Sequence, residues 1–346
     1  GSEPQALPLP HRFGGLHPVW NQIPNELRTT TCGYLLCWRG LSNRAGLQWP
    51  FTFGHYDLLK MNSSIYHFAL AFAVIGTIGC DQIKEPIPPA AEPVAPIDGV
   101  RRKVLLEDFT GHTCNNCPDA ARTAAQLVSL YGDELVVVAV HCTYDFAAPA
   151  SPPNANGSYA TDFRTPAGDA YEIALGVDYL PNGAISRRMF NNSLLHGQSA
   201  WGSAVADIIG QEADLDIWFN QLDFNASANT VNAEVKVAIL NPVQGDQNLT
   251  IYLTEDHIID WQLDNQATPP DVPDYEHRHV LRTTLNGTWG VPLVVGSAAP
   301  GDTLTFTYAN FQLNSAWVGS NCALVAYAYA TDSYEVSQVA ERKFQP

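Results

Sequence analysis

The stretch EDFTGHTCNNCPDAA, residues 107–121, places two cysteines two residues apart where an apolar strand pattern changes to a helical one. Before it, KVLLEDF (residues 103–109) has the apolar, partly branched composition of a strand buried on both faces. After it, PDAARTAAQLVSLYG (residues 118–132) repeats apolar residues at helical spacing and ends at a glycine. LVVVAVHC (residues 135–142) predicts a second buried strand, so this region is expected to form a right-handed parallel strand–helix–strand unit.

The segments that follow predict the rest of an α/β domain. We expect a helix over residues 165–175, a strand over 183–190, a short returning strand at 194–195 and a helix over 198–212. This order of elements is typical of a thioredoxin-like fold. We therefore predict a thioredoxin-like domain over residues 101–213.

From about residue 215 the apolar period changes to two. Segments such as TVNAEVKVAIL and NCALVAYAYA alternate apolar with polar residues, and Asn, Asp, Gly and Pro turns separate them. The pattern predicts an all-β, immunoglobulin-like sandwich of roughly seven strands over residues 214–346. A chain of 346 residues is long enough for these two domains.

Ahead of the two domains, the composition changes at Met61, the first methionine. Residues 1–60 show no helical or strand period, and we expect them to be a disordered leader that is non-native or translated from upstream sequence. Residues 61–80 include a long uncharged apolar run, which is short for a membrane span but typical of a signal peptide. We therefore predict a lipoprotein signal peptide there.

The signal peptide ends in TIGC, residues 77–80, which resembles a lipobox and makes Cys80 the expected lipidation site. Thr77 departs from that motif because leucine is usual at this position, and no Lys or Arg precedes the apolar run. The alternative is a buried hydrophobic helix that ends in an ordinary cysteine. Residues 81–100 are rich in proline and predict a stiff tether that lifts a domain off a membrane.

The net charge of the chain limits the classes of molecule that it can bind. Acidic residues outnumber basic residues 35 to 18, and the net charge of −17 repels phosphate backbones and anionic lipid heads. Nucleic-acid binding is therefore excluded, and membrane contact is expected only through the lipid anchor. No cofactor is predicted, and the oligomeric state stays open.

The cysteine pair resembles the centre of thioredoxins in two further respects. Thioredoxins place a buried acid six residues before the first cysteine and a phenylalanine after that acid, and Asp108 and Phe109 occupy these places. They also place a cis-proline opposite the pair, just before a strand, and Pro181 in VDYLPNGAI fits that position. Asn-Asn stands between the cysteines instead of Gly-Pro, so no relative's redox potential can be transferred.

Each of these residues has an expected role. Cys114, at the N-terminus of the predicted helix, is expected to attack as the nucleophile, because unpaired amides and the helix dipole favour a thiolate. Cys117, one turn inside, would resolve the mixed disulfide, and Asp108 would exchange a proton with it. His112 is a candidate for tuning the thiolate. Pro181, if cis, would present extended backbone to a substrate chain.

Other interpretations of the pair stay open. It would be half of a zinc site if a second pair of ligands existed, but no other C-x-x-C or H-x₃-H follows residue 80. With His112 or His141 it would suit copper. It would also serve as a structural disulfide without turnover. Cys142 and Cys322 are expected to be small buried side chains, with an inter-domain disulfide as the alternative.

Two further segments carry weaker hypotheses. Residues 143–160 are rich in Pro, Ala and Asn and leave the predicted sheet at the edge where the cysteine pair is expected. They are a candidate substrate lid. In residues 274–290, His277 and His279 would share one face of a strand and suggest a metal site, whereas the plainer expectation is a polar strand and turn with Trp289 in the core.

The combination of VLLEDFTGHTCNNCPDAA with a later EHRHVLRTTLNGTWG and an immunoglobulin-like tail resembles the outer-membrane-protein-28-related family of Bacteroidota lipoproteins. The similarity spans about residues 80–346. It implies an outer-membrane lipoprotein of the cell envelope, facing the periplasm or the surface, and no settled substrate. Two functions are therefore weighed: thiol–disulfide exchange on protein thiols and disulfides, or a surface binding or adhesion protein with a structural disulfide.

Overall fold

The computed structural model describes residues 99–345. The expected leader (residues 1–60), signal peptide (61–80) with Cys80, and nearly all of the tether lie outside the described residues. The helices are α2 (Cys117–Tyr131), α3 (Tyr144–Ala147), α4 (Pro166–Leu175) and α5 (Gln198–Ile208). Within residues 99–345, no helix is long and apolar enough to cross a membrane.

The strands of the first half are β1 (Val104–Thr110), β2 (Leu135–His141), β3 (Asn182–Ile185) and β4 (Leu195–His196). Those of the second half are β5 (Leu215–Asn225), β6 (Thr230–Ile239), β7 (Val243–Gln244), β8 (Gln247–Glu255), β9 (Ile258–Leu263), β10 (Asp271–His277), β11 (Val280–Thr284), β12 (Val291–Val294), β13 (Ser297–Ala298), β14 (Thr303–Gln312), β15 (Cys322–Ala330) and β16 (Val336–Lys343).

Helix α2 begins and ends where its sequence favours it. Pro118 lies in the first turn, where its missing N–H leaves no hydrogen bond unmade, and Asp119 places a negative charge near the positive end of the helix dipole. Gly132 ends the helix with a φ of 59°, a conformation that glycine adopts readily. The chain then enters β2, which pairs parallel with β1 so that Leu106 lies opposite Val137.

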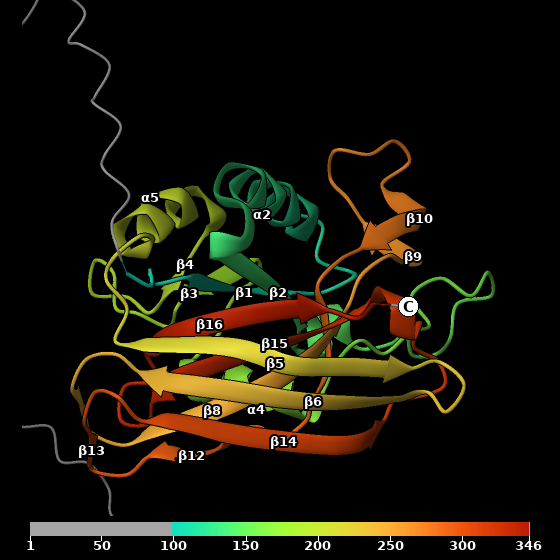
Figure 1. The fold of residues 1–346 in the computed structure, drawn as a ribbon. Helices are drawn as coiled ribbons and strands as arrows, with labels where there is room; N and C mark the ends of the chain where they lie inside the picture. The colour runs from blue at the N-terminus through green and yellow to red at the C-terminus, as the bar shows by residue number, and fades with distance from the viewer. Residues whose placement is uncertain (1–98, 346) are drawn as a thin grey trace, which may run out of the picture. The chain divides into compact units, whose positions relative to one another are not determined.

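A single sheet runs through both halves of the described chain (Figure 1), in the order β16-β15-β8-β11-β2-β1-β3-β4, with β12 beside β8. The halves join where Val280 of β11 lies opposite Ala139 of β2, and the Ala139 N–H donates to the His279 carbonyl at 2.8 Å. Residues on either side of position 213 therefore contribute to the same sheet. The two predicted domains share a sheet and a core rather than packing separately; their exact boundaries stay a prediction.

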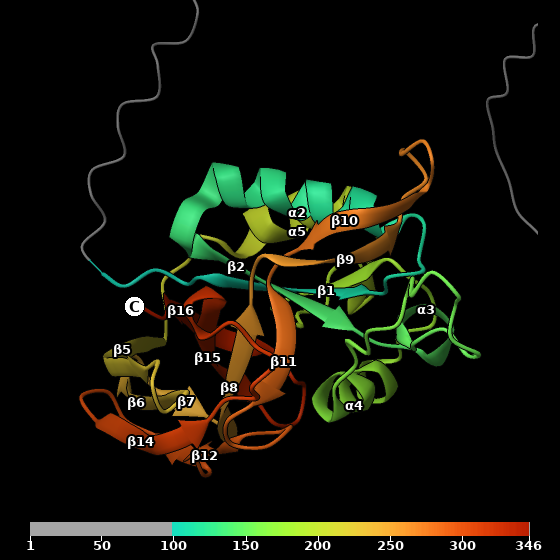
Figure 2. The same cartoon turned by 90° about the vertical axis from the view of Figure 1, so that its right-hand side faces the viewer.

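Three cores lie on the faces of this sheet. Helices α2 and α5 cover one face of the first half, with Trp201 of α5 fully buried there. Helix α4 covers the opposite face, where its Tyr171 meets side chains of both halves (Figure 2). The β14-β6-β5 sheet packs against β8 and β15, and alternate residues such as Ile251 and Leu324 form the largest core between the two layers.

The predicted strand over residues 183–190 is shorter than expected. Strand β3 ends at Ile185, and Ser186 and Arg187 both have a φ of 46°, which ends the extended conformation. This turn directs the Arg187 side chain into the core instead of along a strand. Arg187 is 1% exposed.

The buried Arg187 forms an ion pair with Glu107 of β1. Its Nε and Nη2 donate to the two Glu107 carboxylate oxygens, both at 2.7 Å, and both side chains have no exposed surface. Tyr252 of β8 donates to Glu107 at 2.8 Å, and the Tyr327 hydroxyl of β15 accepts from Arg187 at 3.2 Å. The Tyr171 ring lies 4.7 Å from the guanidinium carbon. The pair thus connects β1, β8, β15 and α4.

The buried pair gives the first testable prediction. Replacing Arg187 by methionine leaves a charged Glu107 without its partner in the core, which is expected to cost about 3–5 kcal/mol in the free energy of unfolding, measured in urea. Arg188→Met is the matched control, because Arg188 is partly exposed and its ion pairs with Asp207 and Glu335 are long, at 4.0 and 3.9 Å. Its expected cost is at most about 1 kcal/mol. Equal losses in the two variants would contradict the proposed importance of the pair.

Candidate functional site

The cysteine pair forms a disulfide between Cys114 and Cys117, in the loop that connects β1 to α2. The expectation that Cys114 lies at the N-terminus of the helix was wrong by one turn. Helix α2 begins at Cys117, and the Cys114 N–H donates to the Gly111 carbonyl at 3.1 Å in the preceding turn. The helix starts late because Pro118 is suited to the first helical turn.

Both cysteines are buried: Cys114 is 3% exposed and Cys117 is 2% exposed. The β9–β10 hairpin, residues 258–277, lies against their loop and hydrogen-bonds to its backbone (Figure 2). Gln262 donates through Nε2 to the carbonyl of Cys114 at 3.2 Å, and the Leu263 N–H donates to the His112 carbonyl at 2.8 Å. A hairpin thus covers the disulfide loop, and only its last residues, 274–277, belong to the segment that was expected from the sequence to form a polar strand and turn.

Side chains fasten the tip of the hairpin to the start of α2. Arg122 pairs with Asp264 at 2.9 Å, and Asn265 donates to the Asn116 side-chain oxygen at 2.6 Å. The Asn265 N–H also donates to the Asn115 carbonyl at 3.0 Å. These bonds use the two asparagines between the cysteines, so the Asn-Asn dipeptide serves as a docking surface for the hairpin.

The insertion over residues 143–160 packs on the same loop. The His112 ring donates through Nε2 to the Ala148 carbonyl at 3.0 Å, and burial lowers the pKa of this histidine. Tyr159 stacks at an angle beside His112 and donates its hydroxyl to Asp271 of the hairpin at 2.5 Å. The predicted lid and the hairpin therefore contact each other over the loop, and His112 is directed to the insertion.

Asp108 lies beneath the pair on β1, on the face covered by α2. It is 3% exposed, and within the described part of the chain no group hydrogen-bonds to its Oδ1. Burial raises the pKa of its carboxyl well above the usual value, so the environment favours the neutral acid. Asp108 and Cys117 line the same small cavity of about 30 Å³, together with His141 and His277. The structure thus brings Asp108 and Cys117 together, as expected.

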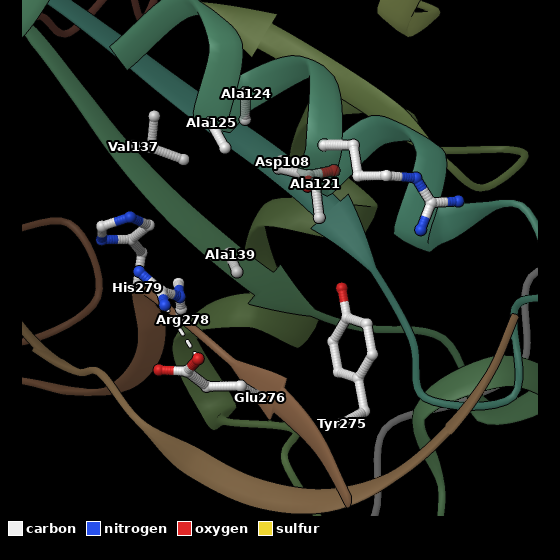
Figure 3. A pocket seen from close by; sticks show the side chains of 11 residues that line it. Asp108, Ala121, Ala124, Ala125, Val137, Ala139, Tyr275, Glu276, Arg278 and His279 are labelled. Atoms are coloured by element: carbon white, nitrogen blue, oxygen red, sulfur yellow. Dashed lines mark hydrogen bonds and ion pairs between the residues drawn. The ribbon is translucent and has the colours of Figure 1, made fainter. Parts of the chain in front are cut away.

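Asp108 also lines a larger cavity of about 280 Å³ (Figure 3). One wall consists of Arg122 and the small side chains of α2 and β2, namely Ala121, Ala124, Ala125, Val137 and Ala139. The opposite wall consists of Tyr275, Glu276, Arg278 and His279, from the hairpin and the turn that follows it. This cavity has no signal in the sequence, because its walls come from segments about 150 residues apart.

The Leu180–Pro181 peptide bond is cis and directly precedes β3, in the position expected from the sequence. Pro181 is buried. It lines neither of the two cavities around Asp108, and its role in presenting backbone to a substrate stays a prediction.

The histidines do not form a metal site. Within residues 99–345, no group of three or more His, Cys, Asp or Glu side chains is arranged to hold a metal ion. His277 faces His141 and Phe163, whereas His279 pairs with Asp256 at 3.2 Å. The suggestion that His277 and His279 share a face was wrong, because the strand ends at His277 and His279 has a φ of 55°.

The two remaining cysteines of the described chain are free and buried, so the alternative of an inter-domain disulfide was wrong. Cys142 directly follows β2 and lies in the core beneath α4. Burial raises the pKa of Cys322 to about 12, which keeps its thiol neutral. Both behave as small apolar side chains, as expected.

The raised pKa of Asp108 predicts a pH dependence of stability. Above about pH 4 an unfolded chain ionises this carboxyl, whereas the folded protein keeps its proton, so the stability that Asp108 contributes falls as the pH rises towards its folded pKa. Asp108→Asn lacks this titration and should gain stability relative to wild type between pH 4 and pH 8. Urea unfolding of both proteins across this range measures the difference. A difference that does not change with pH would contradict the assignment.

The comparisons with known proteins agree with this architecture. HBP35 of Porphyromonas gingivalis is 18% identical over 71% of this chain and 76% of that chain, with a TM-score of 0.53, which supports a similar fold. A domain of the outer membrane lipoprotein Omp28 from Porphyromonas gingivalis is 23% identical over 39% of this chain and 90% of that chain, but its TM-score of 0.26 supports no structural argument. No curated protein matches the chain.

The model of the family described as "Outer membrane protein Omp28" matches residues 168–346, slightly more than half of the chain. The matched residues include the β9–β10 hairpin and both strands that carry the tyrosines around Arg187. The chain therefore belongs to the Omp28 family of outer membrane proteins, which places it at the outer membrane, as its sequence predicted.

Proposed function

We propose that this protein is an outer-membrane lipoprotein that acts by binding, and that Cys114–Cys117 is a structural disulfide in its thioredoxin-like half. The burial of the pair carries this proposal. Both cysteines are at most 3% exposed beneath a hairpin that contributes backbone and side-chain hydrogen bonds to their loop. Exchange requires an attacking thiolate to reach a disulfide sulfur, and this conformation gives it no access.

The order of elements supports a thioredoxin-like first half. Strands β2, β1, β3 and β4 are adjacent, β1 and β2 are parallel, and β3 is antiparallel to β1. Helices α2 and α5 cover one face and α4 covers the other. The cis-proline before β3 and the buried acid before the cysteine pair add to the resemblance. In this half we infer that the fold serves as a scaffold.

The lipid anchor belongs to the same proposal. Cys80 would carry the lipid, and the proline-rich residues 81–100 would hold the folded part away from the membrane. Membership of a family of outer membrane proteins supports this placement. The strongly acidic composition makes nucleic acid an unsuitable partner and leaves the anchor as the means of membrane contact.

Thiol–disulfide exchange with protein thiols is the second candidate function. The shared cavity of Asp108 and Cys117 favours it, because a neutral acid beside the resolving cysteine can exchange a proton with it. For exchange to occur, the β9–β10 hairpin must first move away from Cys114. Thiol–disulfide exchange therefore requires the hairpin to open under reducing conditions, whereas a structural disulfide does not.

The reduction potential of the pair in the native protein tests the proposal. Equilibration in thiol buffers, followed by alkylation of free thiols, should give a value below about −300 mV, which is typical of structural disulfides. A value between about −120 and −270 mV, the span of exchange catalysts, would instead support the second candidate.

The same proposal predicts that the hairpin limits reduction. Gln262→Ala removes one of the donors to each of the Gly111 and Cys114 carbonyls and should speed reduction of the pair by dithiothreitol about tenfold, since each hydrogen bond that holds the hairpin on the loop contributes about 0.5–1.5 kcal/mol. Asn220→Ala is the matched control, because Asn220 is exposed and bonds only to Glu234 in the second half. If both variants reduce at the wild-type rate, the hairpin does not control access.

A further inference from the structure

We propose that the 280 Å³ cavity between α2 and the hairpin binds a small, neutral, largely apolar molecule whose single hydrogen-bond acceptor lies against Asp108. This inference rests on the proposed binding function and names its ligand class. It follows from three observations: the chemistry of the walls, the unpartnered acid inside the cavity, and the pairing of every charge at its rim.

The apolar side chains of the cavity wall favour a ligand with a large apolar surface. On the α2 and β2 side, four alanines and a valine offer methyl groups to the cavity, and Arg122 is the one charged side chain of α2 that lines it (Figure 3). A ligand that leaves water for this surface is bound by the hydrophobic effect. A cavity of about 150 Å³ lined by apolar side chains is known to hold benzene. At about 280 Å³, this cavity suits a molecule of roughly two fused rings.

The acid supplies the specificity. Asp108 lies at the wall of the cavity and is 3% exposed; its Oδ1 has no hydrogen-bond partner and almost no exposed surface, so a ligand would meet the carboxyl group at its other oxygen. A neutral carboxyl carries one O–H donor, and a buried donor without an acceptor is unfavourable. A ligand carbonyl or ether oxygen would accept this hydrogen bond and relieve the cost. Tyr275 directs its hydroxyl from β10 towards the same space, so a second polar group is within the cavity (Figure 3).

The arginines, Glu276 and His279 that line the cavity already have partners in the protein. Arg122 pairs with Asp264 at 2.9 Å, Arg278 with Glu276 at 2.8 Å, and His279 with Asp256 at 3.2 Å. A charged ligand would have to compete with these pairs and lose its own hydration. The arrangement therefore favours a neutral ligand over a carboxylate or an amine.

Two probes of the same shape test the inference on the full chain. The probe 2-acetonaphthone carries a carbonyl acceptor on two fused rings, and 2-ethylnaphthalene has similar size without an acceptor. Isothermal titration should show that the ketone binds about three- to tenfold more tightly, the effect of one net hydrogen bond. Asp108→Leu should abolish this preference while both probes still bind. A preference that survives in Asp108→Leu would overturn the role of the acid.

A second pair of variants tests the location. Ala125 lines the cavity on the exposed side of α2, so Ala125→Trp should fill the mouth and remove binding of both probes. Gln126→Trp places the same ring at the neighbouring exposed position, which does not line the cavity, and should bind as wild type. Absence of binding to wild type, or equal binding by Ala125→Trp, would overturn the proposal. Neither result depends on the reduction potential of the disulfide, so the two proposals fail separately.

Discussion

The Glu107–Arg187 ion pair lies fully buried where the two halves of the sheet meet, and the arrangement of the protein depends on it. A charge buried without its partner is strongly destabilising, so β1 and the turn after β3 must come together with correct geometry. The tyrosine hydroxyls from β8 and β15 complete the pair. The first half therefore cannot satisfy its buried polar groups without the second.

This constraint also positions the candidate site. Strand β8 holds β11, β11 joins β2, and the β9–β10 hairpin lies between β8 and β11 in the sequence. Fixing the second half against β1 thus places the hairpin over the disulfide loop. Adjacent residues of β1 face opposite sides of the sheet, so Glu107 enters the ion pair while Asp108 faces the cavities beneath α2. Glu107 therefore contributes to stability, whereas the neighbouring Asp108 lies at the proposed binding site.

The local elements were predictable from the sequence, whereas their assembly was not. Apolar runs and helical periods gave β1, α2, β2 and α4 nearly to the residue, since these patterns are local. The shared sheet and the hairpin over the disulfide depend on hydrogen bonds between segments about 150 residues apart, which no periodicity reports. One signal for the buried pair was available: Glu107, which follows three apolar residues of a buried strand, requires a buried partner, and residues 186–188 supply two arginines.

In the native fold the β9–β10 hairpin closes the disulfide loop, and hydrogen exchange of the Leu263 and Asn265 amides measures this closure, because these amides donate to the His112 and Asn115 carbonyls. With the hairpin closed, both amides are expected to be protected and to exchange together in one opening event. Exchange of both amides at the rate of an unstructured loop would show that the hairpin leaves the disulfide loop open.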